Sequence, residues 1–258
     1  MSEGTVNYRR DGVVGWITFD RPQARNAMTW VMYEQLSEAC AKAAADLELR
    51  AVVFRGAGGK AFVAGTDIAQ FRSFNSAADG LEYERKMEPY LEAVEALPMP
   101  TLAVIEGWAI GGGLAIAAAC DLRIATPGTR FGVPIARTLG NCLSVANYAR
   151  LVAALGASRA KKMLLMAENL TAEEALDGGF VAEIVPPEAL DARIAAYTDR
   201  LSSGAPITLR VTKEAIRRLL HAGMPDGEDL IAQAYGSADF RTGVEAFVSK
   251  QEPRWTGR

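Results

Sequence analysis

The first twenty residues show two short runs of strand-forming residues separated by a turn. The turn is Asp11-Gly12, a pair typical of tight connections between neighbouring strands. The run that follows it is Val13-Val14-Gly15-Trp16-Ile17-Thr18-Phe19, and Asp20-Arg21-Pro22 ends this run. Because β-branched and aromatic residues favour strands, the pattern predicts two strands within residues 4–20.

Apolar runs and helical patterns then alternate along the chain. Short apolar runs predict buried strands at residues 51–56, 101–105, 122–125 and 180–185. Helical patterns occupy residues 28–49, 79–97 and 113–120, and the second of them ends before Pro98 and Pro100. Strands that alternate with helices in this way imply parallel pairing and βαβ crossovers.

Two helix starts carry capping signals, and the last part of the chain is helical throughout. Thr29 is a candidate cap for the helix at 28–49, and Thr171-Ala172-Glu173-Glu174 has the form of a capping box. From about residue 188 only helical patterns remain. A spacing of four predicts one face of a helix, which carries Ile207, Val211, Ala215 and Leu219.

Residues 101–120 form a stretch that is long and apolar enough to resemble a membrane span. However, Glu106 lies inside it, and Gly107 and Gly111-Gly112-Gly113 interrupt it. We therefore predict a buried strand, a tight turn and a buried helix. The opening residues MSEGTVNYRRDG hold no apolar run of the kind that a signal peptide needs. We expect no membrane partner and a cytoplasmic location.

The charge balance and the metal-binding residue types exclude several function classes. Twenty-eight basic and 31 acidic side chains give the 258-residue chain a net charge of −3, so no global basic field argues for a nucleic-acid partner. Cys40, Cys120 and Cys142 lack the spacing of a zinc site and the density of a disulfide scaffold, and we expect reduced thiols. His221, the single histidine, argues against a His-rich metal centre and leaves a Ser-His-Asp triad one possible base.

Three stretches, in fixed order, carry a family resemblance. They are Phe62-Val63-Ala64-Gly65-Thr66-Asp67-Ile68, then Ile105-Glu106-Gly107-Trp108-Ala109-Ile110-Gly111-Gly112-Gly113 leading to Ala119-Cys120-Asp121-Leu122-Arg123-Ile124-Ala125 and Phe131-Gly132, and the tail Asp239-Phe240-Arg241-Thr242-Gly243-Val244-Glu245-Ala246-Phe247. Arg21-Pro22 with Asn26-Ala27 adds a weaker fourth. Over nearly the whole chain, these motifs resemble the enoyl-CoA hydratase/isomerase (crotonase) superfamily.

The resemblance implies an α/β fold in which repeated ββα units wind as a spiral. We expect this spiral core, with an acyl-CoA site, over residues 1–195. A helical C-terminal region over residues 196–258 is then expected to serve oligomerisation and to cover an active site. Members of the family are usually homotrimers or dimers of trimers. The resemblance implies an acyl-CoA thioester as the substrate, with no metal and no separate cofactor, because CoA enters as part of the substrate.

An enolate of a CoA thioester carries negative charge on its oxygen, and two backbone N–H groups can stabilise that charge without reorganising. In the family, one donor lies at the position that Thr66 matches, and the other is the middle glycine of the triplet, Gly112. Gly112 is expected to open a helix, whose N-terminus adds a positive end. The alternatives are a merely flexible turn at the glycine triplet and a turn-capping role for the Thr66 hydroxyl.

The resemblance also places the CoA contacts. Backbone near Ala24 and along Ala64, Gly65, Asp67 and Ile68 is expected to hold the pantetheine and adenine, and Gly111 belongs to the same substrate site. Arg25 is a candidate partner for a phosphate, with a solvated surface arginine as the alternative. We assign structural roles to the Asp67 and Asp121 side chains, which lie inside shared motifs.

Both glutamates that hold and activate water in the family's hydratases are absent. Ala115 stands two residues after the glycine triplet, and Ile135 stands four residues after Phe131. If the following segment is one residue longer than usual, Ala136 is the second match instead. None of these side chains can move a proton, and general acid–base catalysis typically contributes about 10²–10⁴-fold. The residues therefore favour a lyase, decarboxylase or isomerase over a hydratase.

Other polar groups fall where the family builds its active site. Arg137 is a candidate for binding a carboxylate of the acyl group, as in decarboxylation, and an ion pair within the fold is the alternative. Cys142 or Ser144 is a candidate for donating or orienting a proton. A small core residue and a helix cap are the respective alternatives.

Two further sets of residues are tempting as acids or bases. His221 lies near a helix end, where a cationic histidine is favourable without any catalytic role. Glu82, Glu84 and Glu88 lie on the helix before Pro98, a region from which some members of the family draw acid–base groups. We interpret them as a solvated helix face. A protein that binds acyl-CoA without turnover is the alternative function. A purely structural oligomer is disfavoured, because the glycine triplet would then have no chemical reason.

Overall fold

Two β-sheets form the centre of the computed structural model, which describes residues 3–224 and 226–256. The larger sheet has the order β1-β2-β3-β5-β7-β10, and the smaller has the order β4-β6-β8-β9. The larger sheet comprises β1 (Thr5–Asp11), β2 (Val14–Asp20), β3 (Ala51–Gly56), β5 (Thr101–Ile105), β7 (Leu122–Ala125) and β10 (Glu183–Ile184). The smaller comprises β4 (Ala61–Val63), β6 (Trp108–Ile110), β8 (Arg130–Gly132) and β9 (Leu170–Thr171).

A repeated ββα unit generates both sheets. In each repeat the first strand joins the larger sheet, the second joins the smaller sheet, and a helix follows. The repeats are β3-β4-α2, β5-β6-α3 and β7-β8-α4, with α2 at Ala77–Glu95, α3 at Gly112–Ala119 and α4 at Ile135–Thr138. Equivalent strands pair in parallel in both sheets. This arrangement confirms the predicted spiral of ββα units.

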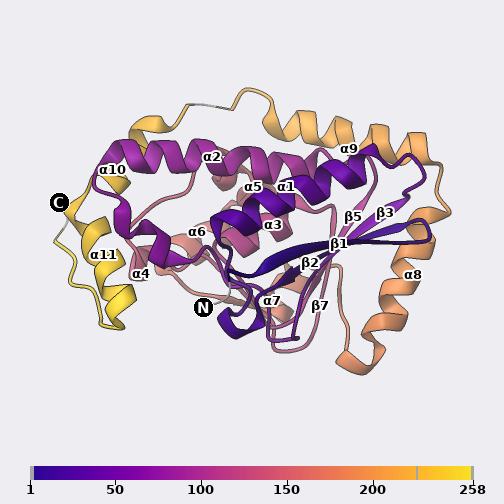
Figure 1. Ribbon diagram of the computed structural model, residues 1–258, viewed down its shortest axis with the longest axis horizontal. Coiled ribbons are helices and arrows are strands. Elements are labelled where there is room, and N and C mark those ends of the chain that lie inside the picture. Colours follow the sequence, from indigo (N-terminus) through magenta and orange to yellow (C-terminus); the bar gives the residue numbers. More distant parts are fainter. Residues whose placement is uncertain (1–2, 225, 257–258) are drawn as a thin grey trace.

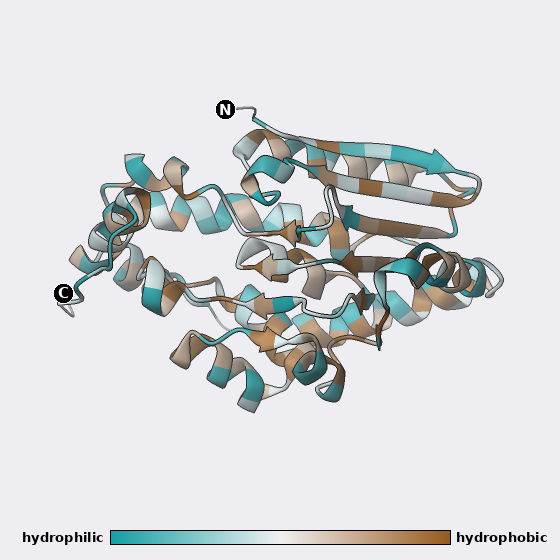
Figure 2. Ribbon diagram, turned by 90° about the horizontal axis from the view of Figure 1, so that it is seen from below, coloured by the Kyte–Doolittle hydropathy of each residue, from teal (hydrophilic) through white to brown (hydrophobic). Residues whose placement is uncertain are grey.

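Helices cover the sheets and complete the core. Thr29 caps α1 (Trp30–Ala45), because its side-chain oxygen accepts a hydrogen bond from the N–H of Met32. The remaining short elements and helices before the C-terminal region are η1 (Pro22–Ala24), η2 (Ile68–Ser73), α5 (Val145–Leu155), α6 (Ala157–Met166), α7 (Ala172–Asp177) and η3 (Pro187–Ala189). Figure 2 shows that hydrophobic residues are concentrated on the central strands.

Most predicted elements are present, and several differ in their ends. The helix predicted at 28–49 is the shorter Trp30–Ala45, which begins after its cap at Thr29. The helix predicted at 79–97 begins at Ala77, because Ser76 and Asp79 form a capping box. The strand predicted at 180–185 is reduced to Glu183–Ile184. Its first residues, Phe180 and Val181, donate their N–H groups to the carbonyl of Ala175 in α7 and cannot use them in the sheet.

The C-terminal part is helical, as predicted. It comprises α8 (Leu190–Ser202), α9 (Pro206–His221), α10 (Glu228–Tyr235) and α11 (Ala238–Ser249). Helix α10 packs on α2, while α11 packs on η2 and α4 of the same chain (Figure 1). The division into 1–195 and 196–258 remains a prediction, and α8 runs across its boundary.

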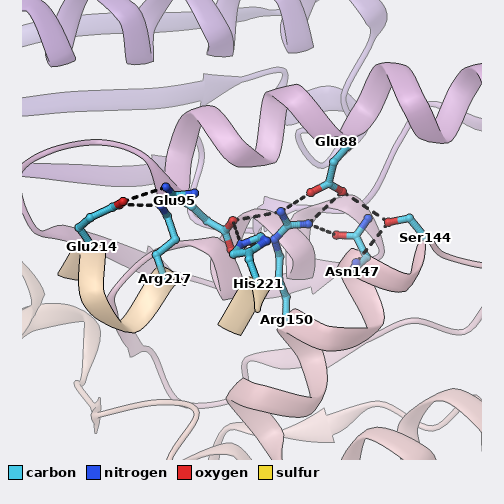
Figure 3. Close-up of polar contacts among 8 residues, drawn as sticks. All are labelled: Glu88, Glu95, Ser144, Asn147, Arg150, Glu214, Arg217 and His221. Carbon is cyan, nitrogen blue, oxygen red and sulfur yellow. Dashed lines mark hydrogen bonds and ion pairs between the residues drawn. The ribbon is translucent and has the colours of Figure 1, made fainter. Parts of the chain in front are cut away.

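A buried cluster of charges joins three helices that are distant in the sequence. Arg150 of α5 has a side chain only 4% exposed, and it contacts both Glu88 and Glu95 of α2. Its Nε lies 2.8 Å from Glu95 Oε1. His221, at the end of α9, places Nε2 3.1 Å from Glu95 Oε2 (Figure 3). This cluster fixes α5 and α9 to α2 and accounts for His221 without a catalytic role.

Within the described part of the chain, no helix is long and apolar enough to span a membrane. The apolar stretch 101–120 instead forms β5, β6 and α3. The predicted strand and helix are confirmed, whereas the segment predicted as a turn also contains the three-residue strand β6. All three cysteines are free thiols, also as predicted.

Candidate active site

Two loops from different repeats meet above the smaller sheet. The loop after β4 is held by Met28, whose N–H donates to Gly65 O at 2.8 Å and whose carbonyl accepts from Asp67 N–H at 2.8 Å. The turn after β6 contains Gly111 and leads into α3, whose first residue is Gly112. A side-chain Cβ at Gly112 would lie 3.4 Å from Thr66 Oγ1. The two predicted donor residues, Thr66 and Gly112, are therefore neighbours in space.

Each of these two residues presents a backbone N–H group that has no acceptor among the described residues. Met28 forms hydrogen bonds with the carbonyl of Gly65 and the N–H of Asp67, but not with the Thr66 N–H that lies between them. Gly112 is the first residue of α3, where backbone N–H groups have no partner within the helix. Gly111 turns the chain into α3 with φ 53°, a conformation that suits glycine. The helix N-terminus adds partial positive charge at the same place.

A chain of three hydroxyl groups lies beside the two loops. Tyr33 Oη is 2.8 Å from Thr66 Oγ1, which in turn is 3.3 Å from Tyr83 Oη. The alternative of a turn-capping Thr66 hydroxyl is therefore wrong, and Asp67 caps η2 instead. Burial raises the pKa of Tyr33 to about 12, so its phenol stays protonated at neutral pH. The hydroxyl chain supplies neutral polar groups rather than a charge.

The prediction that Glu82, Glu84 and Glu88 form a solvated face of α2 is wrong for Glu84. Glu82 is exposed as predicted. Glu84, however, is 5% exposed, because it shares a buried stripe with Gly80, Met87, Leu91 and Val94. That spacing of three and four was visible in the sequence and is the signal that could have located Glu84. Glu88 also departs from the prediction, because it pairs with Arg150.

The Glu84 carboxyl is held by groups from two other parts of the chain. The Tyr235 hydroxyl of α10 donates to Glu84 Oε1 at 2.8 Å, and the Ser144 N–H donates to Oε2 at 3.1 Å. Burial raises the pKa of Glu84 to about 7, although these two hydrogen bonds act to lower it. A carboxyl with this pKa populates both of its protonation states near neutral pH.

The expected CoA-binding segments lie side by side. The N–H of Ala64 donates to Arg25 O at 3.0 Å, which joins the η1 loop containing Ala24 to the segment from Ala64 to Ile68. The Arg25 side chain is exposed and has no polar contact with another described residue. The Asp67 carboxylate is already paired with Arg21 Nη1 at 2.9 Å, in accord with its predicted structural role.

The remaining candidates have separate positions. Asp121 has the predicted structural role, since its carboxylate accepts from Thr101 and from Lys213. Arg137, in α4, is exposed, and its side chain makes no hydrogen bond or ion pair with another described residue. Ser144 caps α5, which confirms the helix-cap alternative. Burial raises the pKa of Cys142 to about 12, and this thiol packs against α10.

The positions of the missing glutamates are apolar in the structure as well. Ala115 in α3 is 8% exposed and belongs to the hydrophobic core. Ile135 is partly buried and packs against the same core. No carboxylate occupies either position, and among the described residues no group of three His, Cys, Asp or Glu side chains is placed to hold a metal ion.

Comparison with known proteins identifies the family. The sequence profile of enoyl-CoA hydratase/isomerase matches residues 9–258. The chain belongs to the enoyl-CoA hydratase/isomerase family. Among curated members, the short-chain-enoyl-CoA hydratase of Clostridium acetobutylicum is 30% identical over 256 residues, which cover 98% of this chain and 97% of the relative.

Solved structures of the family include proteins named for different reactions. An enoyl-CoA hydratase/carnithine racemase from Magnetospirillum magneticum aligns with a TM-score of 0.81 and 32% identity, covering 100% of this chain and 97% of that one. A methylmalonyl-CoA decarboxylase in complex with 2-nitronate-propionyl-CoA aligns with a TM-score of 0.89 and 25% identity, covering 98% of each chain. Family membership thus indicates CoA-thioester chemistry and leaves the reaction open.

Proposed function

We propose that this protein binds an acyl-CoA thioester and stabilises its enolate between the backbone N–H groups of Thr66 and Gly112. The observation that carries the proposal is the meeting of these two residues, each with an N–H group that has no acceptor in the described part of the chain. Preorganised donors of this kind stabilise charge that develops during the reaction. The N-terminus of α3 strengthens the effect at Gly112.

Within this class, a decarboxylase or another lyase is the first choice, and an isomerase is the next. Hydration needs a group that activates water, whereas Ala115 and Ile135 occupy the positions that carry it in the family's hydratases. Decarboxylation generates the enolate without removing a proton. The structural likeness to a methylmalonyl-CoA decarboxylase supports this choice, while the hydratase names of several relatives keep hydration as an outcome to test.

The CoA moiety is proposed to lie along the two adjoining backbone segments, at Ala24 and from Ala64 to Ile68. Arg25 is the proposed phosphate contact, and its exposed guanidinium supports this role. Arg137 remains the candidate for a carboxylate on the acyl group. We also propose a cytoplasmic homotrimer or dimer of trimers as the working assembly.

The test is a mass-spectrometric turnover screen with crotonyl-CoA, longer enoyl-CoAs and carboxylated acyl-CoAs. Gly112→Pro removes the proposed donor, since proline has no N–H and is tolerated in the first turn of a helix. Gly112→Ala is the matched control, because it adds the same Cβ, 2.6 Å from Tyr33 Oη, and keeps the N–H. We expect the proline variant to be about 10²–10³-fold slower than the alanine variant.

Each outcome selects a function. Turnover of a carboxylated thioester alone supports the decarboxylase and makes Arg137→Ala the next variant. Efficient hydration of crotonyl-CoA means that another group activates water. Binding of acyl-CoA without product favours a binding protein. Equal rates for the proline and alanine variants would remove Gly112 from the proposed site.

A further inference from the structure

Among the described residues, Glu84 is the only aspartate or glutamate that is buried. Its contacts with Tyr235 and Ser144 are hydrogen bonds from uncharged donors, and no arginine or lysine forms an ion pair with it in the described chain. Keeping a buried carboxyl charged without a neighbouring cation is energetically costly. Two other carboxyls of the same helix, by contrast, each have a cationic partner. Glu88 and Glu95, on the same helix, share Arg150.

The position of Glu84 connects it to the proposed enolate site. The preceding residue, Tyr83, places its hydroxyl 3.3 Å from the side chain of Thr66. Burial is the main cause of the raised pKa values of Tyr83 and Tyr33, and negative charge on Glu84 raises both further. On its other side, Glu84 contacts Tyr235, whose ring packs 6.1 Å from that of Tyr83.

The C-terminal helices keep water away from this carboxyl. Tyr235 is 2% exposed and fits against Gly80, where a Cβ would lie 2.1 Å from its ring. Phe240 of α11 packs on the same ring at 4.8 Å. The carboxyl therefore lies at the base of the C-terminal cover, between α2 and α10. Of its roughly four acceptor positions, protein donors occupy two, so it retains capacity to take up a proton.

We propose that Glu84 is the acid–base residue of this site and moves a proton to and from the acyl carbon next to the thioester. The inference rests on the proposed function, because it requires the enolate held by Thr66 and Gly112. In the forward step, the C–H bond breaks, the proton goes to a Glu84 oxygen, and the electron pair moves to the thioester oxygen. In the reverse step, Glu84 returns the proton to carbon. After a decarboxylation, the protonated form of Glu84 supplies the proton that replaces carbon dioxide.

The competing role for Glu84 is purely structural, as an anchor for Tyr235 and for the start of α5. The two roles differ in a measurable way. An anchor affects stability and binding, whereas an acid–base residue sets the rate and pH dependence of proton exchange. Because its pKa is about 7, proton abstraction by Glu84 is expected to rise with pH and to have its midpoint near neutrality.

The experiment measures exchange of the α-hydrogens of propionyl-CoA with deuterium oxide, read by mass spectrometry, beside propionyl-CoA affinity from calorimetry. Glu84→Gln keeps the size of the side chain and removes its basicity. Glu82→Gln is the matched control, since Glu82 lies on the same helix and is exposed. We expect exchange to fall about 10²-fold or more in the first variant, with affinity within about twofold, and to be unchanged in the second.

A second variant keeps the test decisive if Glu84→Gln folds poorly. Tyr235→Phe removes one hydrogen bond that lowers the pKa of Glu84 and leaves the carboxyl in place. We expect the midpoint of the exchange profile to move to higher pH. Exchange at the wild-type rate in Glu84→Gln, or an unmoved midpoint in Tyr235→Phe, would overturn the role of Glu84. Binding of propionyl-CoA without exchange by the wild type would overturn it too, whereas failure of the wild type to bind any acyl-CoA would remove the proposed function itself.

Discussion

At the residue scale, Glu84 leaves a signature in the stability of the protein that does not depend on any substrate. Burial raises its pKa from the ordinary 4.5 to about 7, so the folded form holds a proton that the unfolded chain has lost over this range. Folding then binds more protons than unfolding does, and stability must decrease as pH rises. The contribution is fully present below about pH 4.5 and is lost as the pH passes through about 7.

We predict that the free energy of unfolding falls by about 3 kcal/mol more in the wild type than in Glu84→Gln as the pH rises through this range. Other titrating groups are common to both proteins and cancel in the difference. The measurement is urea denaturation of the two proteins at several pH values. A constant difference between them would mean that Glu84 titrates alike in the folded and unfolded states.

The same residue shows where sequence reasoning stops. Ala115, and Ile135 or its alternative Ala136, could be identified from the chain alone, because motifs place them relative to the glycine triplet and to Phe131. The burial of Glu84 depends on Tyr235, which lies 151 residues further along the chain. A glutamate within a charged helix resembles a solvated residue until the partner helix that covers it is known. The local signal in the sequence was the three- and four-residue spacing that Glu84 shares with Gly80, Met87, Leu91 and Val94.

At the scale of elements, the charge cluster around Arg150 is what joins α5 to α2. Removing the guanidinium leaves Glu88 and Glu95 facing each other with side chains only 22% and 10% exposed. Breaking a buried ion pair by removing one partner is strongly destabilising, because the remaining charge is left without compensation. Arg217 offers the contrast, since its partner Glu214 lies on the same helix and both side chains are about one-third exposed (Figure 3).

We predict that Arg150→Met lowers the free energy of unfolding by about 3 kcal/mol. Arg217→Met, the matched control, should lower it by less than about 1 kcal/mol, because exposed pairs contribute little. Denaturant titrations of both variants against the wild type supply the comparison. Similar losses in the two variants would show that the Arg150 cluster does not hold the helices together.

Hydrophobic periodicity alone predicts the strands of the larger sheet but not those of the smaller sheet. Ala51–Gly56, Thr101–Ile105 and Leu122–Ala125 form at the predicted residues, because each is a buried apolar run bounded by turn residues. The smaller sheet uses strands of two or three residues. Such short strands show no alternation of their own and form only where the repeats of the spiral align them. Hydrophobic periodicity therefore predicts the larger sheet, whereas the smaller sheet is expected only from the ββα repeat that the family motifs imply.

At the scale of the whole molecule, α9 is the element that the single chain leaves incomplete. The face predicted from the spacing of four is present, but none of the residues of α9 is buried. Its large apolar side chains are exposed, namely Ile207 (67%), Val211 (58%), Ile216 (52%), Leu219 (76%) and Leu220 (46%). A groove between α9 and the core is lined by Leu209, Ile216 and Leu220. Contiguous apolar surface of this kind is typical of protein–protein contacts.

The proposed homotrimer or dimer of trimers would bury this face of α9, so a variant in α9 tests the proposed assembly. Leu219→Glu places a charge where an interface would exclude water, and we predict that light scattering finds a mass shifted toward that of one chain. Leu165→Glu is the control, because Leu165 in α6 is equally exposed at 78% but lies outside this face. An unchanged mass in Leu219→Glu would exclude α9 from the interface. Since α10 and α11 follow α9 and cover Glu84, loss of assembly should also slow turnover if α9 positions this cover.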